Sequence, residues 1–438
     1  MQKIDAPPPG EISEAVVLKG SLVVGLGLAV GQVTGFVRQA AIGYVSGTGS
    51  EADALMAAMA PVELWWAVMS LTVIFGFVPK FSASNPSLRY SFGGIFRAAA
   101  RLSMLATVCV LVFADAVIHL FAPGLDAETH ANAVNLLRVM APAQAAIGVS
   151  FVYSALLFSH RRFGMGSFHH VFINATTLLG GLAGYGRWGP YGFAVGYTIG
   201  SYLQLAAAHW SSRKLIPLHS GRGNVPGLVD LLAGPAPIMG QALAMELITA
   251  VSRAYASTFG PGMTSAFDYG YKLFRVPVAL LVVPLSHALL PELSSRQGSA
   301  EHRKTALLAA ERGAMLTVVG GAVVMATFML LRKPIVEILF QRGEFQSAST
   351  DAVATILLGY MPVVIGRGLT DFLSRSLFAM GKVQAPLAAT VLALVLNFAI
   401  CLALPADEPL LIGLGAIVGF SVGAAWIVWS VVRFRRHG

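Results

Sequence analysis

Long apolar segments recur along the whole 438-residue chain, and this feature limits the possible folds more than any other. Only 12% of the residues are charged, compared with roughly 25% in a soluble globular domain. Apolar stretches of about 18 residues or more are long enough to cross a bilayer as helices. Lipid cannot satisfy exposed backbone polar groups, so helices are the only spanning structure that suits such stretches. The sequence therefore predicts an all-α polytopic membrane protein.

Twelve transmembrane helices are expected. They cover residues 15–45, 54–79, 93–121, 131–159, 166–185, 190–210, 226–258, 264–291, 304–330, 349–378, 385–404 and 409–432. The polar, proline-rich segment 1–14 is not followed by a short apolar core with a cleavage site, so it is interpreted as a cytoplasmic tail rather than a signal peptide.

The basic residues are distributed unevenly between the two ends of these spans. With the N-terminus inside, twenty of the 30 Lys and Arg fall on the cytoplasmic side and four fall outside: Arg187, Arg332, Lys333 and Arg342. Such a bias orients membrane proteins. It predicts a multi-pass membrane protein with both termini cytoplasmic. It also explains the net charge of +9 without a nucleic-acid partner.

One sequence unit occurs twice, 215 residues apart. "GFVRQAAIGYVSGTGSEAD" ends at Asp53, and "AVSRAYASTFGPGMTSAFD" ends at Asp268; each has Arg and Asp fifteen residues apart. Six spans separate the copies, so both face the same way. This predicts two parallel, pseudo-symmetric six-helix lobes, an arrangement that suits alternating access. The N-lobe covers 15–210, a cytoplasmic linker 211–225, and the C-lobe 226–438 with a basic C-terminal tail.

The repeated arginines, Arg38 and Arg253, are the first candidate functional residues. A charge near the middle of a bilayer costs at least about 2.5–3.5 kcal/mol. Three interpretations are open: each arginine extends to the outer interface, each pairs with the aspartate of its own unit (Asp53 or Asp268), or both line a water-filled cavity.

Further cations favour the cavity. Lys272 and Arg275 are three residues apart, which places them on one helix face. Together with Arg38 and Arg253 they predict a cationic substrate-binding cavity, and arginine suits phosphate because its planar fork binds two oxygens. Arg367, Asp371 and Arg375 form a ladder of spacing four that fits a self-neutralised structural network equally well.

Other polar and aromatic residues within the spans have weaker signals. Glu246 and Asn397 are candidates for binding a coupling cation, and Glu246 is also a candidate partner of Arg253. Trp65 and Trp66 suit either stacking on a sugar or an interfacial aromatic belt. His169 and His170 lie near the inner end of the fifth span, so we expect them to be interfacial histidines rather than the catalytic histidine of a membrane acyltransferase. Cys109 and Cys401 give no disulfide or metal signature, and no metal site or catalytic residue is expected.

Several of these stretches resemble one family. "GFVRQAAIGYVSGTGSEADA" (35–54), "LFRVPVALLVVPLSHALLPELS" (273–294), "LFQRGEF" (339–345) and "SLFAMGKVQAP" (376–386) are similar to the MurJ (MviN) family of lipid II flippases. This family belongs to the multidrug/oligosaccharidyl-lipid/polysaccharide (MOP) exporter superfamily. The resemblance implies a MATE/MurJ-like, V-shaped transporter of the bacterial cytoplasmic (inner) membrane. It would move an undecaprenyl-pyrophosphate-linked glycan from the inner to the outer leaflet.

The resemblance also assigns roles to single residues. Arg38 matches the functional first-helix arginine, Asp53 its acidic partner, and Lys272 stands where the family has an arginine. The sequence departs from the family pattern at Gln32 and Trp65, where arginines are usual, and at Ser70, where an acid is usual. Gln32, Trp65, Asp53 and Asp268 are therefore expected as structural or gating partners. Typical members also carry two further C-terminal spans.

The expected function is a flippase for a lipid-linked oligosaccharide, most simply the peptidoglycan precursor lipid II. An exopolysaccharide repeat unit on the same lipid carrier is the alternative substrate. A drug/cation antiporter would favour an acidic cavity, and an enzyme acting on the lipid-linked glycan would need a catalytic constellation. The expected partners are the lipid-linked substrate and membrane lipids, with no obligate protein partner. No cofactor is expected; without a Walker A loop, the energy source is the membrane potential or a monovalent cation.

Overall fold

The computed structural model describes residues 14–72, 77–78, 81, 92–216, 236–294, 300–379, 382–405 and 408–437. The N-terminal half contains α1 (Glu14–Ser46), α2 (Ser50–Leu71), α4 (Phe92–Val112), α5 (Ala114–Phe121), α6 (Ala127–Met140), α7 (Pro142–Ser159), α8 (Phe163–Ser167), α9 (His169–Trp188) and α10 (Tyr191–Ser212). The C-terminal half contains α12 (Ala236–Ser257), α13 (Met263–Ser294), α14 (Ala300–Phe340), α15 (Ser347–Tyr360), α16 (Val363–Ala379), α17 (Gln384–Ala403), the 3-10 turn η3 (Pro409–Gly413) and α18 (Leu414–His437).

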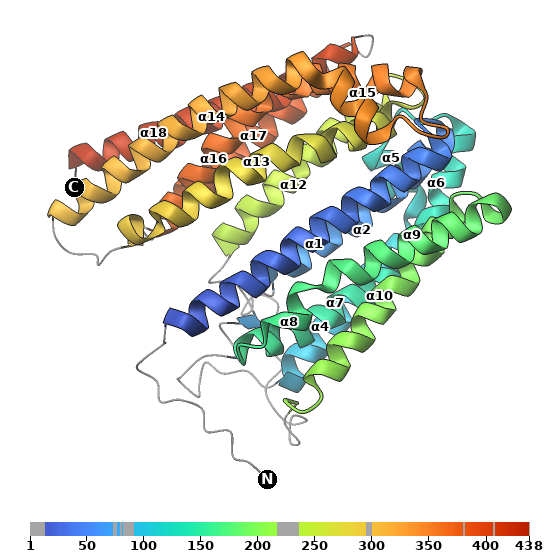
Figure 1. The fold of residues 1–438 in the computed structure, drawn as a ribbon, viewed down its shortest axis with the longest axis horizontal. Helices are drawn as coiled ribbons and strands as arrows, with labels where there is room; N and C mark the ends of the chain where they lie inside the picture. Colours follow the sequence, from blue (N-terminus) through green and yellow to red (C-terminus); the bar gives the residue numbers. More distant parts are fainter. Residues whose placement is uncertain are drawn as a thin grey trace.

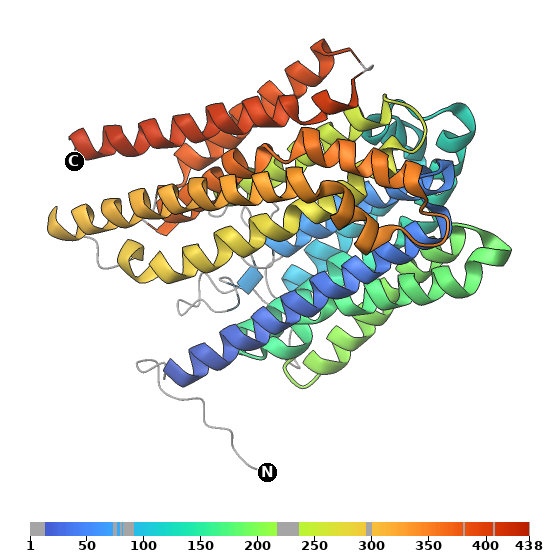
Figure 2. The same ribbon diagram turned by 45° about the horizontal axis from the view of Figure 1, so that its top comes forward.

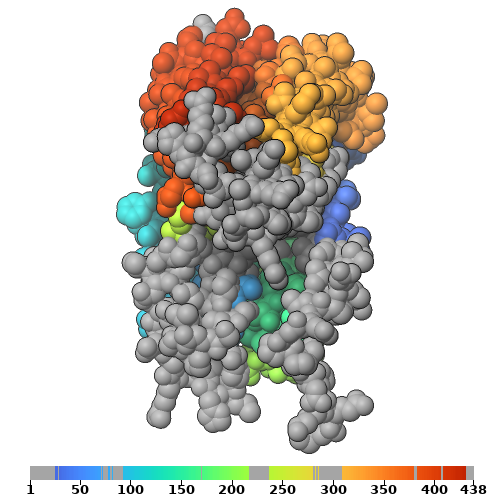
Figure 3. Space-filling model, turned by 90° about the vertical axis from the view of Figure 1, so that its left-hand side faces the viewer, coloured from blue at the N-terminus to red at the C-terminus, as the bar shows by residue number. Residues whose placement is uncertain are grey.

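The two halves form separate helical lobes. In the N-lobe α1 packs on α9, α9 on α10, α10 on α7, and α7 on α4; in the C-lobe α12 packs on α17, α17 on α18, and α16 on both α14 and α18. The lobes diverge toward the end where α1 begins and α18 ends, and they converge at the opposite end (Figures 1 and 2). Seen from the terminal end, the orange and red helices of the C-lobe lie above the blue and green N-lobe (Figure 3).

The described helices make twelve passes through the bundle when α4–α5, α6–α7, α8–α9, α15–α16 and η3–α18 are each counted once. This confirms the expected all-α, two-lobed fold. The third, fourth and tenth spans, expected to be continuous, are each broken into two helices. Pro142 begins α7, and Pro362 separates α15 from α16, which meet at a 53° bend. Proline lacks the backbone N–H and clashes with the preceding turn, which breaks a helix.

Hydropathy varies among the twelve passes. By length and composition alone, six described helical segments qualify as membrane spans, or seven if α15 and α16 count as one bent span. Among the passes that fall short, α1, α12 and α13 carry the charged residues singled out above, at Arg38, Arg253, Asp268, Lys272 and Arg275. A helix that lines a polar interior needs an apolar surface only on its other sides.

The outer surface is apolar. Leu105, Met315, Leu330 and Leu402 are between 59% and 79% exposed, and the apolar window of α14 is only 11% buried within the protein. Contiguous apolar surface of this kind is unfavourable in water but suits contact with acyl chains. The buried apolar residues form one cluster that extends through both lobes, with fully buried members such as Phe193 in the N-lobe and Phe420 in the C-lobe.

Candidate functional site

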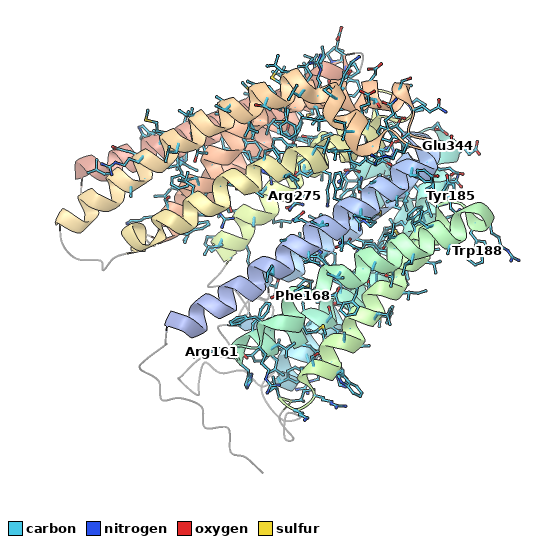
Figure 4. All side chains as sticks on the ribbon, viewed as in Figure 1. Arg161, Phe168, Tyr185, Trp188, Arg275 and Glu344 are labelled. Atoms are coloured by element: carbon cyan, nitrogen blue, oxygen red, sulfur yellow. The ribbon has the colours of Figure 1, made fainter. Side chains whose placement is uncertain are left out.

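A cavity of about 210 Å³ lies between the lobes. Side chains of α1, α2, α9 and α10 line it from the N-lobe, and α12 and α13 line it from the C-lobe. Four cationic and three acidic side chains contribute to its wall: Arg38, Arg253, Lys272, Arg275, Glu63, Glu246 and Asp268. Arg275 lies along α13 between the end marked by Glu344 and the end marked by Arg161 (Figure 4). The expected cations therefore share one cavity, but three carboxylates nearly balance their charge.

Arg38 pairs with a residue that the sequence analysis did not select. Its Nη2 donates to Glu63 Oε1 at 2.9 Å. The expected partner, Asp53, is engaged elsewhere, so the pairing of Arg38 with Asp53 is wrong. Arg38 is only 6% exposed, and its Nε is buried without a hydrogen-bond partner among the described residues.

Arg253 and Asp268 form the ion pair that one interpretation of the repeat predicts. Arg253 Nη2 and Nε donate to Asp268 Oδ1 at 2.7 and 2.9 Å, and Nε also approaches Oδ2 at 3.1 Å. The two side chains are 11% and 10% exposed. A carboxylate that engages two nitrogens of a guanidinium fixes its orientation as well as its charge. Arg253 is therefore held firmly within its own lobe.

Lys272 and Arg275 have no ion-pair partner in the described part of the chain. The Lys272 ammonium reaches across to α1, because a Cβ atom on Gly35 would lie only 3.1 Å from its Nζ. The same glycine-rich face of α1 contacts α9, where a Cβ on Gly31 would lie 3.1 Å from His170. The small residues of α1 thus allow a cation of the other lobe to approach closely.

Asp53 joins the lobes at the end where they converge, which we name the closed end. Its Oδ2 accepts a hydrogen bond from the backbone N–H of Gly262 at 2.6 Å, and its Oδ1 accepts one from the backbone N–H of Ser265 at 2.7 Å. Asp53 is 1% exposed. Hydrogen bonds to an ionised acceptor are among the strongest in proteins. Asp53 is therefore placed to hold the two lobes together rather than to neutralise Arg38.

Other hydrogen bonds between the lobes gather at the same end. The Glu344 N–H donates to Tyr44 O at 2.9 Å, and the Tyr269 hydroxyl donates to Gly47 O at 3.1 Å. The Thr48 and Ser349 hydroxyls lie 2.9 Å apart. Glu344 also marks this end in Figure 4. These contacts separate the cavity from the surroundings at the closed end.

Two glycines in equivalent places of the repeat allow this close packing. Gly47 and Gly262 both have positive φ, 55° and 85°. A Cβ atom on Gly262 would lie 2.2 Å from Thr48 O, and one on Gly47 would lie 2.5 Å from Glu344 O. Only glycine combines this backbone conformation with such a short approach.

The aromatic candidates have different positions. The Trp65 indole N–H donates to Gln144 O at 3.0 Å inside the N-lobe, and Trp65 is not part of the cavity lining. Trp66 does line the cavity and packs on His170, with ring centroids 4.0 Å apart. His170 therefore faces the cavity, contrary to the expected interfacial position. The side chain of His169 lies outside the described residues.

The remaining candidates are also separated. Gln32 and Glu246 line the cavity, whereas Asn397 is fully buried in the C-lobe and donates to Ile248 O at 3.2 Å. The structure does not bring Glu246 and Asn397 together at the cavity wall. Arg367, from the expected ladder, is buried and donates to the hydroxyl of the cavity residue Tyr271 at 3.0 Å.

Glu63 is the main cavity residue that the sequence analysis missed. The available signal was its place in the apolar stretch "ELWWAV" of the second span. An ionisable residue inside a span is a candidate functional residue by default. The repeat gives no support to Glu63 as a functional residue, because the equivalent position, 215 residues later, is Val278.

Comparison with known proteins gives consistent matches. The family model described as "Lipid II flippase MurJ" matches residues 70–435. The probable lipid II flippase MurJ of Thermotoga maritima is 24% identical over 427 residues, covering 94% of this chain and 81% of that protein. The lipid II flippase MurJ of Burkholderia cenocepacia is 27% identical over 297 residues, covering 64% of this chain and 57% of that protein.

Two solved structures share the fold. The lipid II flippase MurJ in an inward closed conformation has a TM-score of 0.81 at 20% identity, covering 94% of this chain and 87% of that one. An inward-facing multidrug resistance MATE transporter of the MOP superfamily has a TM-score of 0.72 at 15% identity, covering 95% of this chain and 99% of that one. At these sequence identities, both comparisons show a similar fold and nothing more.

Proposed function

Because the chain belongs to the MurJ family of lipid II flippases, we propose that it moves lipid II across the bacterial inner membrane by alternating access. It is a membrane transporter and not an enzyme. The single observation that carries the mechanism is the cavity itself. Cations of both lobes, Arg38 and Lys272, face one chamber whose closed end is held by hydrogen bonds between the lobes.

The geometry supports a rocking mechanism. The substrate pyrophosphate is expected to meet the Lys272 ammonium and the Arg275 guanidinium, which have no described ion-pair partner. Opening toward the other side of the membrane requires the lobes to separate at the closed end, which breaks the two hydrogen bonds of Asp53. Parallel repeats around a central site suit such a movement. The positive-inside bias supports placing the closed end in the periplasm and both termini in the cytoplasm.

The charge of the cavity supports an alternative to lipid II as the substrate. Four cationic side chains and three carboxylates line the cavity, which leaves one positive charge in excess. Gln32 is neutral where the family pattern implies an arginine. A nearly balanced cavity suits an uncharged sugar better than an acidic peptide stem. The second candidate is therefore an exopolysaccharide repeat unit on the same pyrophosphate lipid carrier.

Depletion of the protein in its host distinguishes the two substrates. If lipid II is the substrate, lipid II accumulates in the inner leaflet and cells lyse. If cells keep their shape and lose a secreted polymer, the exopolysaccharide is the substrate. Complementation of a flippase-deficient strain tests the site itself. Arg38→Ala should abolish complementation while protein levels stay near normal, and unchanged complementation would remove Arg38 from the transport mechanism.

The energy source is part of the proposal. Lipid pyrophosphate is an anion, and a membrane potential that is negative inside favours its outward movement by about 2.3 kcal/mol per charge per 100 mV. Coupling to a monovalent cation through Glu246 is the alternative, and Asn397 would contribute only after a rearrangement of the C-lobe. No cofactor takes part in either scheme.

A further inference from the structure

Glu63 lies where cations of three helices converge. Its carboxylate accepts a hydrogen bond from Arg38 of α1 at 2.9 Å and also interacts electrostatically with Lys272 of α13 and Arg253 of α12. The Arg38 side chain is 7% exposed, whereas that of Glu63 is 44% exposed. The arginine thus forms part of the wall, and the carboxylate stands in front of it on the cavity side.

The contact with Glu63 leaves Arg38 only partly satisfied. A guanidinium carries five N–H donors in a rigid fork. One nitrogen, Nη2, donates to Glu63, while Nε is buried without a partner among the described residues. A buried donor without an acceptor is unfavourable. A tetrahedral phosphate offers several oxygens to the fork and can engage Nε and Nη2 together, which the single oxygen of Glu63 does not.

We propose that Glu63 is the counter-ion of Arg38 until substrate binds, and that the substrate pyrophosphate displaces it from Arg38. This inference rests on the proposed transport of a pyrophosphate-linked lipid. It assigns Glu63 as a residue that sets substrate affinity rather than one that contacts the glycan.

The two ion pairs of the cavity support a division of roles. Asp268 accepts three hydrogen bonds from Arg253 and is 10% exposed, so that pair is fixed. Glu63 accepts a single hydrogen bond from Arg38 and is 44% exposed, so that pair is held by fewer contacts than Arg253–Asp268. The position of Val278 in the repeat carries no carboxylate. Only the N-lobe therefore combines a buried arginine with an exchangeable counter-ion at this place in the repeat.

An exchangeable counter-ion serves both halves of a transport cycle. A site that moves its ligand across a membrane must bind it strongly enough to load and weakly enough to release. Glu63 competes with the phosphate for Arg38 and so favours release. After release it neutralises Arg38 again, which matters because an unpaired charge in a membrane interior is costly. The empty transporter can then return without an unpaired Arg38.

The test compares the binding of undecaprenyl pyrophosphate to the purified full-length protein and to Glu63→Gln in detergent. Glutamine keeps the size and removes the charge. We expect the variant to bind about tenfold more tightly, with unchanged binding of uncharged undecaprenol. In proteoliposomes its maximal rate of lipid II flipping should fall, because release becomes slower. Glu246→Gln is the matched control: it removes the same charge from the same cavity without touching Arg38, and its gain in affinity should be clearly smaller.

Several outcomes would overturn the inference. Unchanged or weaker binding by Glu63→Gln, at a wild-type melting temperature, shows that Glu63 does not compete with phosphate. An equal gain in Glu246→Gln shows that net charge alone is responsible. If Glu63→Gln does not fold, the double variant R38Q/E63Q decides: we expect it to fold and to bind at least tenfold more weakly than wild type, whereas wild-type binding means a purely structural pair. Failure of the wild-type protein itself to bind undecaprenyl pyrophosphate refutes the proposed function, and the inference with it.

Discussion

At the scale of single residues, two arginines in equivalent places of a repeat have different tasks. Arg253 is held by the aspartate of its own unit, Asp268, whereas Arg38 pairs with Glu63 from α2. The equivalent aspartate of the N-lobe, Asp53, accepts hydrogen bonds from the backbone of the C-lobe instead. The repeat thus preserves residue types and spacing while the two copies use them asymmetrically.

Replacing Asp53 should weaken the closed end. Asp53→Asn retains one acceptor oxygen and loses the charge, and a hydrogen bond to a charged group contributes about 1.5–3 kcal/mol. The equilibrium should shift by about tenfold or more toward a state open at this end. The measurement is labelling of Met56→Cys, a buried cavity residue, by a membrane-impermeant thiol reagent added from the periplasmic side, in a chain without Cys109 and Cys401.

Asp126→Asn is the matched control for this experiment. Asp126 also accepts two backbone hydrogen bonds, from Glu128 and Thr129, but it caps α6 within one lobe. Labelling at Met56→Cys should therefore stay at the wild-type level. Equal labelling in both variants would mean that Asp53 has no special role in closure.

At the scale of helices, a proline lies in the fourth pass of each lobe; the C-lobe pass is bent by 53° there, whereas the N-lobe pass runs on as one span over 127–159. Pro142 lies at the boundary between α6 and α7, and Pro362 at the boundary between α15 and α16. The helices before these prolines, α6 and α15, each have 14 residues. Together with the positive φ of Gly47 and Gly262, this supports the predicted pseudo-symmetry, under which Arg38 and Arg253 should superpose within about one helical turn, ~5 Å.

The turn between α12 and α13 offers a test of close packing. Gly262→Ala introduces a Cβ that would lie 2.2 Å from Thr48 O in the opposite lobe. We expect flipping in proteoliposomes to fall at least tenfold, because the closed end can no longer form, while the amount of folded protein stays similar. Gly260→Ala is the control: φ is 108° there, so an alanine is strained as well, but no atom lies within 4 Å. Similar losses in both variants would point to backbone strain rather than closure.

At the scale of the whole molecule, the two lobes converge at one end (Figure 1), where hydrogen bonds of side chains and backbone join them. Hydrogen bonds between the lobes gather at the closed end, so a relative movement of the lobes has to break them there. The alternating-access proposal therefore predicts that a covalent link at the closed end stops transport.

The pair Thr48→Cys and Ser349→Cys provides this link. The two hydroxyls lie 2.9 Å apart across the lobes, so cysteines in their places should form a disulfide after oxidation in a chain without Cys109 and Cys401. Lipid II flipping should stop in the oxidised protein and return after reduction. Each single variant serves as a control and should be insensitive to oxidation. Continued flipping by the fully cross-linked protein would refute alternating access.

The membrane potential should act on the complete transport cycle. If one net negative charge crosses with each substrate, a potential of 100 mV changes the driving force by about 2.3 kcal/mol. Flipping in proteoliposomes should increase when a potassium gradient with valinomycin makes the compartment of origin negative, and decrease at the opposite polarity. A rate that follows a sodium gradient and ignores the potential would favour cation coupling.

The sequence by itself determined the fold class, the twelve passes and the shared location of four cations. Apolar length fixes a membrane helix because lipid leaves no alternative for the backbone, and spacing along a helix fixes which residues share a face. The spacing of Lys272 and Arg275 is therefore enough to place them on the same side of one helix. Likewise, the repeat alone predicted that Arg38 and Arg253 belong to equivalent helices.

Only the tertiary structure decided which charges meet. The sequence separation of 25 residues between Arg38 and Glu63, or of 209 between Asp53 and Gly262, contains no information about contact, because these pairs form through packing between helices. The same is true of His170 of α9, which packs on Trp66 of α2 in the cavity wall. Which residues share a helix face depends only on their spacing along that helix. Which residues form an ion pair in a cavity depends on how closely separate helices pack and on which carboxylate lies nearest to each cation.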